Sequence, residues 1–227
     1  MADKAISYGA IEQPFGEFAG WESKNSNLNV SKTRATATSQ YGDEVASELH
    51  DEKTEASEDL QCNNDTNSIP EDIGALEGNY ILTGININTS EGAFATMSLS
   101  GHNHAQNAHA AEPALRNAAH GLTVAKAFGA TDFLGGTAGD TASAISGSLN
   151  IQCDHNDQND GDGDHLVGEN CNFRVEAKTT WVGVPSVAAE AGWDVTVTTT
   201  TDENTGFQKT EVSGIKKLDV TEEGGES

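Results

Sequence analysis

The chain has 227 residues and a formal net charge of −24, with 36 acidic side chains against 12 Lys and Arg. So few cations argue against phosphate-mediated binding, and we expect no sequence-specific nucleic-acid partner. Apolar residues make up only 35% of the sequence, so the buried core must be thin. The length favours one all-β domain with an extra segment over two full domains.

Residues 1–27 are expected to form an N-terminal arm. Tyr8, Phe15, Phe18 and Trp21 are separated by glycines without a clean helical or strand period, which is typical of a segment that packs aromatic rings onto another surface, such as a second subunit. The first residues lack the features of a signal peptide, and no apolar run approaches the roughly 18 residues needed to span a membrane. We therefore expect synthesis in a host cytoplasm and no membrane partner.

Residues 28–218 are expected to form a single β-rich domain that opens with a long hairpin. Apolar or basic residues alternate with small polar ones over 28–40, residues 41–43 are typical of a turn, and residues 44–62 return as an acidic strand. A helix is the alternative for residues 44–62, because apolar residues there also recur at helical spacing.

A second hairpin is predicted from residues 80–88 and 94–100, with a turn at 89–92, because apolar residues alternate on both sides of the turn. Residues 105–130 predict the one helical segment of the chain. Pro113 suits an early helical position, and an approximate apolar stripe follows it.

A third hairpin has a predicted register. Folding the chain back at Asp162 gives three facing pairs: Cys153 with Cys171, Ile151 with Phe173, and Leu149 with Val175. All six side chains then share one face, because the side-chain period of a strand is two. Residues 154–170 become a long acidic hairpin loop between these strands.

A fourth hairpin is predicted around the turn signal at residues 202–206, which sets Val195 near Val212. The acidic, Gly-rich residues 219–227 are expected to be a disordered tail. The predicted fold is mainly β, with antiparallel hairpins forming a sandwich or partial barrel around one helical segment. Because the core is thin, we expect oligomerisation to complete it.

The acidic loop predicts a calcium site, because Ca²⁺ prefers hard oxygen ligands at alternate positions. The best alignment to an EF-type loop gives four ligands: Asp160, Asp162, Asp164 and Glu169. The loop lacks the first-position Asp, where Gln158 stands, and strands flank it. A solvated loop whose Asp, Asn and Gly residues accept positive φ is therefore the alternative.

Two further groups of residues predict other metal sites. The first offers the N and S ligands that Zn²⁺ prefers and consists of Cys153, His155, His165 and Cys171. In the second, His102 and His104 share a face if a strand continues through them, with His109 and His120 downstream. Buried thiols and hydrogen-bonded histidines explain both groups without a metal.

The sequence contains no recognisable catalytic triad, phosphate-binding loop or nucleophile elbow. We therefore expect no enzymatic activity. Three cysteines make an odd count, which favours reduced thiols over a disulfide framework.

The long polar hairpin with its turn at Gly42-Asp43, the later hairpins, the intervening helix and the acidic surface together resemble virion structural proteins of tailed phages. The pattern is most similar to the tail-tube family, which is related in fold to the tube protein of type VI secretion, and it covers roughly residues 28–218. In that family each subunit contributes strands to an inner barrel shared around a ring. The resemblance implies a non-enzymatic virion subunit that assembles with itself into stacked rings, contacts other virion proteins and forms a conduit for DNA.

A conduit would give the acidic strand a role. A lumen lined by its glutamates would repel DNA phosphates within a Debye length of about 8 Å; these are Glu44, Glu48, Glu52, Glu55 and Glu58. Plain solubility is the alternative explanation of the charge. The rival function is a capsid decoration or adhesin-like β-sandwich that binds through a calcium loop at 154–170, and a small metal-binding enzyme is a third alternative.

Overall fold

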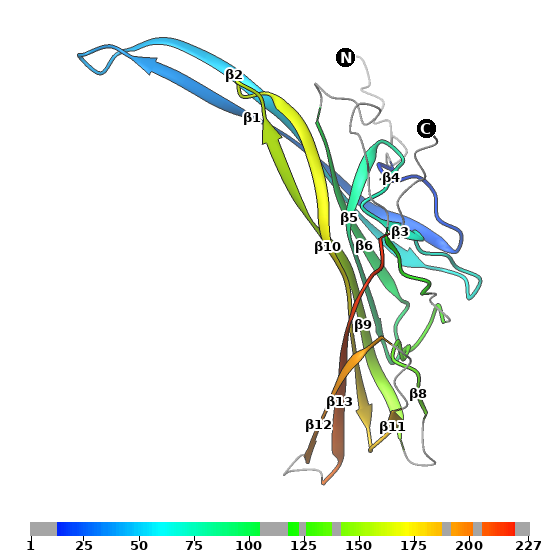
Figure 1. Ribbon diagram of the computed structural model, residues 1–227. Coiled ribbons are helices and arrows are strands. Elements are labelled where there is room, and N and C mark those ends of the chain that lie inside the picture. The colour runs from blue at the N-terminus through cyan, green and yellow to red at the C-terminus, as the bar shows by residue number, and fades with distance from the viewer. Residues whose placement is uncertain are drawn as a thin grey trace, which may run out of the picture.

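The computed structural model describes residues 13–104, 118–122, 126–137, 142–187, 192–201 and 206–220. Its centre is a nine-stranded antiparallel sheet in the order β1-β2-β6-β5-β9-β10-β13-β12, with β4 paired to β5 (Figure 1). The strands of this sheet are β1 Trp21–Thr38, β2 Glu44–Cys62, β4 Leu76–Glu77, β5 Tyr80–Ser90, β6 Thr96–His104, β9 Ser143–Asn159, β10 His165–Val182, β12 Asp194–Thr201 and β13 Gln208–Lys217. Two short ladders lie apart from it: β3 Asp72–Ile73 with β7 Ala118–Ala119, and β8 Gly136–Thr137 with β11 Ser186–Val187.

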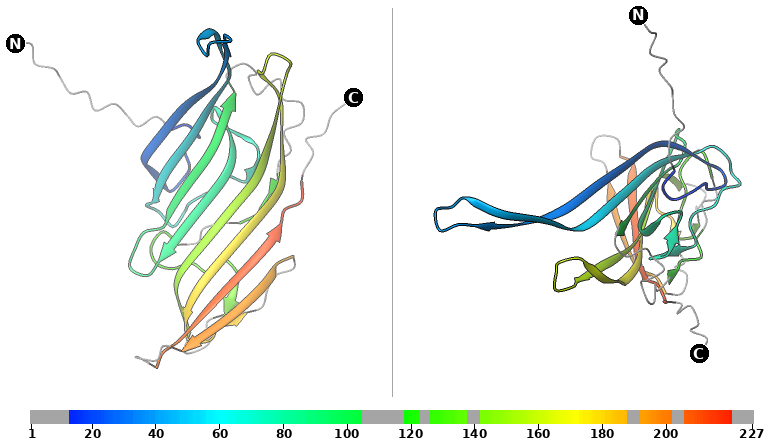
Figure 2. Two further views of the ribbon diagram at one scale, coloured as in Figure 1. Left: turned by 90° about the vertical axis from the view of Figure 1, so that its left-hand side faces the viewer. Right: turned by 90° about the horizontal axis from the view of Figure 1, so that it is seen from above.

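The predicted mainly β fold of antiparallel hairpins is confirmed. The long strands lie side by side in one open sheet that does not close into a barrel (Figure 2). Connecting segments cover one face of this sheet, which makes the domain sandwich-like. The covering segments contribute Phe15, Ile69, Ile73, Ala118 and Leu134 to the core.

A row of apolar side chains crosses the middle of the sheet. Leu99 on β6 faces Ile85 on β5, which faces Ile151 on β9, which in turn faces Val175 on β10. Each of these residues is at most 1% exposed. Burial of one such side chain contributes about 1.5–3 kcal/mol, so this row holds the four strands together.

Glu58 on β2 continues this row, because it faces Leu99 and is only 1% exposed. Burial raises the pKa of the Glu58 carboxyl, since surroundings of low polarity disfavour the charged form. The expectation that Glu58 lines a lumen is therefore wrong, because its position is inside the core of one copy.

Replacing Glu58 with Gln is expected to stabilise the protein at neutral pH. A raised folded-state pKa means that the folded protein holds the proton more tightly; the resulting stability is present below the unfolded pKa and is lost as pH rises through the folded pKa. Each pKa unit corresponds to about 1.4 kcal/mol. Thermal unfolding of Glu58→Gln should show a higher Tm than the unmodified protein at pH 7 and little difference near pH 4.

The exposed neighbour Glu55 provides the control, since Glu55→Gln removes the same charge from the surface of the same strand. It should leave the Tm nearly unchanged at both pH values. A Glu58→Gln effect that is equal at pH 4 and pH 7 would contradict the assignment of the gain to a buried charge.

The predicted first hairpin is confirmed, and the alternative helix over residues 44–62 is wrong. β1 and β2 pair along their whole length, and Gly42 adopts a φ of 86° in the turn between them. The outer part of the hairpin projects away from the sheet (Figures 1 and 2). β1 begins at Trp21, inside the segment assigned to the N-terminal arm, and Phe15 packs edge-on against Tyr80 of its own chain.

The helix expected over residues 105–130 is not borne out by the described part of that segment. Ala118–Ala119 form β7, and Phe128 makes an isolated bridge with Phe94. Gly121 and Gly129 have φ values of 66° and 95°, which no right-handed helix contains. Residues 105–117 and 123–125 lie outside the described residues.

The described residues contain no helix that is long and apolar enough to span a membrane.

The third hairpin turns where predicted, but residues 154–170 are not a loop, because β9 runs to Asn159 and β10 starts at His165. The predicted register is also wrong, since Val175, not Phe173, faces Ile151. Two bulges in β10 each insert one residue, one after His165 and one between Cys171 and Arg174, where Asn172 has a φ of 53°.

The two bulges explain which side chains stay in the core. Together the two bulges shift β10 by two residues from the predicted register. Because the side-chain period of a strand is two, this shift keeps each side chain on its predicted face, and Phe173 and Val175 remain buried. Cys171 lies between the bulges and is displaced by one residue, which leaves it partly exposed while Asn170 is buried.

The fourth hairpin is confirmed as β12 and β13, although Val197, not Val195, faces Val212. The segment 202–205 and most of the acidic tail, residues 221–227, lie outside the described residues.

Candidate functional site

Four side chains able to bind a metal ion come together where β5 begins. They are His104 on β6, His155 and Asp157 on β9, and His165 on β10; we call them the His/Asp cluster. Their ligand atoms lie within 4.8 Å of one another, and among the described residues this is the one group of at least three His, Cys, Asp or Glu that gathers in this way.

The position of the cluster follows from the sheet. β5 lies between β6 and β9, but its pairing with β6 stops at Ile81–His102 and its pairing with β9 stops at Gly84–Gln152. The cluster residues of β6 and β9 lie beyond these pairs. Their side chains therefore fill the gap that β5 leaves between the two strands.

One carboxylate oxygen lies at the centre of the cluster. Asp157 Oδ1 is 2.5 Å from His155 Nε2 and 3.4 Å from both His104 Nε2 and His165 Nε2. The rings of His104 and His165 stack, with centroids 3.7 Å apart and planes inclined by 12°. Both imidazoles are 1% exposed and Asp157 is 28% exposed, so the cluster is largely shielded from water.

A second layer of contacts orients His155. Its Nδ1 lies 2.7 Å from Asn170 Oδ1, and Asn170 Nδ2 donates to the carbonyl oxygen of Gly74 at 3.1 Å. Because the amide nitrogen of Asn170 is used by Gly74, its oxygen faces the ring and accepts a hydrogen from Nδ1. His155 therefore directs Nε2 into the cluster, as second-layer partners of metal-binding histidines do.

The electrostatics of the cluster keep Asp157 charged. Burial alone would raise the pKa of the Asp157 carboxyl, but its contacts with His104 and His155 outweigh this effect and hold the pKa well below its usual range. Burial lowers the pKa of His165. Burial, helped by the nearby His155, also lowers the pKa of His102 to about 3. A neutral imidazole such as that of His165 offers the lone pair that a metal ion requires.

No protein-family model matches this chain, and no curated protein matches it. Function is therefore inferred from the residues themselves.

The four predicted calcium ligands lie next to the cluster but outside it. Asp160 Oδ1 accepts the backbone N–H groups of Asp162 and Asp164 at 2.9 and 3.0 Å, which closes the β9–β10 turn. Asp164 Oδ1 accepts the Asp51 N–H at 3.2 Å, and Glu169 is exposed on β10. These four carboxylates do not come together in the structure, and the calcium site stays a prediction.

Two members of the predicted zinc set come together, and the other two do not. His155 and His165 meet in the cluster, but the two cysteines lie elsewhere: Cys153 Sγ contacts the carbonyl oxygen of Thr83 at 3.8 Å, and Cys171 Sγ accepts from Asn156 at 3.3 Å. Burial raises the pKa of the Cys153 thiol to about 12, so it is a poor source of thiolate. All three cysteines are free thiols.

The other predicted histidine group supplies the missing ligand. His104 belongs to the cluster, whereas His102 lies just outside it against His155, with ring centroids 3.9 Å apart and planes inclined by 50°. His120 Nε2 bonds to the carbonyl oxygen of Pro70, and His109 lies outside the described residues. The sequence analysis missed Asp157, although its spacing of two from His155 puts both side chains on one strand face.

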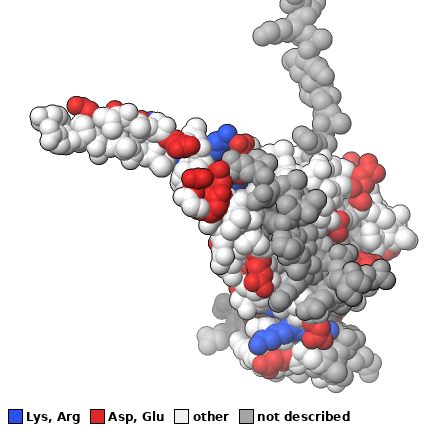
Figure 3. All heavy atoms as spheres, turned by 45° about the horizontal axis from the view of Figure 1, so that its top comes forward, with Lys and Arg blue, Asp and Glu red and all other residues white. Residues whose placement is uncertain are grey.

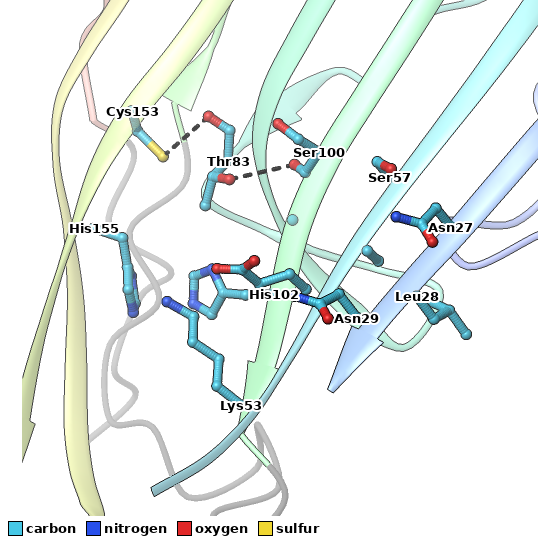
Figure 4. A pocket seen from close by; sticks show the side chains of 13 residues that line it. Asn27, Leu28, Asn29, Lys53, Ser57, Thr83, Ser100, His102, Cys153 and His155 are labelled. Atoms are coloured by element: carbon cyan, nitrogen blue, oxygen red, sulfur yellow. Dashed lines mark hydrogen bonds between the residues drawn. The ribbon is translucent and has the colours of Figure 1, made fainter. Parts of the chain in front are cut away.

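A hollow of about 600 Å³ lies beside the cluster, lined by residues of β1, β2, β5, β6 and β9. Figure 4 shows His102, His155 and Lys53 directed toward one another at one end of it. Lys53 Nζ lies 3.7 Å from Asp157 Oδ2, so the two oxygens of Asp157 have different partners. Of the four cluster residues, His155 lines the hollow.

Proposed function

We propose that the chain is a non-enzymatic structural subunit that assembles with copies of itself into stacked rings, as a tail-tube protein does in a phage virion. The observation that carries this proposal is the outer part of the β1–β2 hairpin. All residues from 27 to 49 are exposed except Ser39 in the turn, which is half-buried, so neither face of the hairpin is covered. A lone two-stranded hairpin is marginally stable in water, so a partner must cover it.

The hairpin carries the apolar surface that such a partner would bury. Leu28, Val30, Val45 and Leu49 are 39–65% exposed. Two cations of the hairpin, Lys32 and Arg34, already pair with Glu52 and Glu44 at 2.6 and 2.5 Å. These pairs reduce the charge that an approaching partner meets.

The open sheet supports the same proposal. Its two outer strands, β1 and β12, lie at opposite edges, and exposed edges of this kind readily pair with further strands. Pairing of β12 in one copy with β1 in the next would continue the sheet around a ring. Acidic side chains form several separate groups on the surface seen in Figure 3, which favours assembly that depends on salt or cations.

A shortened hairpin tests the proposal. Thr33 faces His50, so residues 34–49 can be replaced by an Asn-Gly turn without altering the rest of the register. Electron microscopy and sedimentation over a salt and calcium series should show rings or tubes for the full chain and monomers for the shortened one. The Tm of the shortened chain in its monomeric form should change little, because the deleted residues bury almost nothing.

Discrete monomers or trimers of the full chain under every condition would overturn the proposal. They would instead favour the decoration or adhesin-like module, above all if Ca²⁺ raised the Tm. Rings that form equally well from the shortened chain would remove the hairpin from the assembly contact and overturn the observation that carries the proposal.

A further inference from the structure

We propose that the His/Asp cluster is a Zn²⁺ site in which His104, His155, Asp157 and His165 are the four ligands. The proposal concerns one copy of the chain and does not depend on ring assembly.

The donor set selects the class of metal. Three imidazole nitrogens and one carboxylate oxygen suit Zn²⁺ and its neighbours in the first transition series, whereas Ca²⁺ and Mg²⁺ prefer oxygen ligands throughout. Four such ligands are also the number that a tetrahedral zinc site uses. We name Zn²⁺ because it needs no redox chemistry from the protein.

The spacing of the donor atoms matches such an ion. Zn–N and Zn–O bonds of about 2.0–2.1 Å place tetrahedral ligand atoms about 3.3 Å apart. The distances from Asp157 Oδ1 to His104 Nε2 and to His165 Nε2 are both 3.4 Å. The third distance from Asp157 Oδ1, 2.5 Å to His155 Nε2, would need to open by under about 1 Å, and the distances between the imidazole nitrogens are at most 4.8 Å.

The position of the ring hydrogen on His155 favours a cation between His155 Nε2 and Asp157 Oδ1. With its hydrogen on Nδ1 donated to Asn170, a neutral His155 presents a lone pair at Nε2. That lone pair faces the carboxylate of Asp157, which is also an acceptor. Two acceptors in contact need either a proton or a metal ion between them, and the two further imidazoles at the same oxygen favour the metal.

His104 supplies an independent observation. Its imidazole is 1% exposed, yet neither ring nitrogen forms a hydrogen bond of ordinary geometry, since Nε2 only approaches Asp157 Oδ1 at 3.4 Å. Buried polar groups without a partner are rare and call for an explanation, which an ion bound at Nε2 provides. The other nitrogen, Nδ1, lies 3.7 Å from Asp51 Oδ1, where a carboxylate would support a metal-bound ring.

The site would fix the base of the projecting hairpin. Asp51 lies in a bulge of β2 with a φ of 52°, and its N–H donates to Asp164. The adjacent His50 lies 2.9 Å from the carbonyl oxygen of Gly163 through its Nδ1. A metal ion that joins β6, β9 and β10 would hold the β9–β10 turn in place, and this turn is what the hairpin base contacts.

The test measures metal binding directly, on the full chain purified without a polyhistidine tag. After dialysis against a chelator, added Zn²⁺ should bind with a stoichiometry of one per chain and raise the Tm. Co²⁺ in its place should give the visible absorption of a tetrahedral nitrogen and oxygen site. Asp157→Asn should weaken Zn²⁺ binding by roughly tenfold or more and abolish the Co²⁺ spectrum.

Asp162→Asn is the matched control, because it makes the same change in the neighbouring turn, and it should leave both readouts unchanged. His165→Asn removes a ligand without disturbing the contact between Asp157 and Lys53, so it decides the question if Asp157→Asn does not fold. Absence of stoichiometric Zn²⁺ binding by the unmodified chain would overturn the proposal. Binding that Asp157→Asn and His165→Asn leave intact, or that only Asp162→Asn weakens, would overturn it as well.

Discussion

Ile151→Asp is expected to destabilise the protein by about 4 kcal/mol or more. Ile151 is fully buried in the middle of β9, between Ile85 and Val175 on the neighbouring strands. A carboxylate at this position would be removed from water with no cation to pair with in the apolar row. Natural domains unfold with only about 5–15 kcal/mol, so a large part of the total stability would be lost. Denaturant unfolding followed by circular dichroism measures the change.

Ile215→Asp provides the control, because it makes the same substitution on β13 at a position that is 52% exposed. Its effect should stay within about 1 kcal/mol. Equal stability of the two variants would mean that the face of β9 carrying Ile151 is not the core face.

Gly147→Ala is expected to destabilise the protein by about 3 kcal/mol, at the upper end of overpacking effects. A Cβ at this position in β9 would collide with the carbonyl oxygen of Thr131 in the covering segment. The two segments are also joined through Thr89, whose Oγ1 donates to the Gly147 carbonyl at 3.2 Å and accepts the Thr131 N–H at 3.0 Å. Because the obstacle is backbone, the covering segment itself must move.

Gly161→Ala tests whether this effect belongs to the close approach. Gly161 lies in the β9–β10 turn with nothing within 4 Å of the Cβ position, so the change should alter stability by less than about 0.5 kcal/mol. Thermal unfolding of both variants gives the comparison. A Gly147→Ala variant as stable as Gly161→Ala would show that the segment around Thr131 does not pack against β9.

The hairpins could be predicted because their signals are local. The turn at Gly42 and the cluster of Asp and Gly around Asp162 each mark a reversal, and alternation on both sides identifies the strands. In the described part of residues 105–130 the expected helix is wrong for a local reason as well, since Gly121 and Gly129 adopt positive φ values that interrupt a helix.

The register could not be predicted, because a bulge is decided by tertiary packing. Nothing in the residues around Asn172 shows that an extra residue lies there, yet this bulge moves Cys171 out of the core and brings Asn170 in. The consequence reaches the candidate site, because Asn170 is the residue that orients His155.

The cluster was only partly predictable for a related reason. His155 and His165 belong to one hairpin and were grouped correctly, but His104 comes from a strand about 50 residues earlier in the sequence. It joins them only because β5 begins too late to separate β6 from β9. Pairings between distant segments of this kind have no signal in a single sequence.

The order of strands also bears on the timing of assembly during translation. β1 and β2 lie at one edge of the sheet and are made early, whereas β12 and β13 lie at the opposite edge and are made late. A nascent chain therefore displays one edge while the complementary one has not yet emerged from the ribosome. Under the proposed pairing of β12 with β1, two chains that are still being translated cannot form this contact before synthesis has passed residue 201.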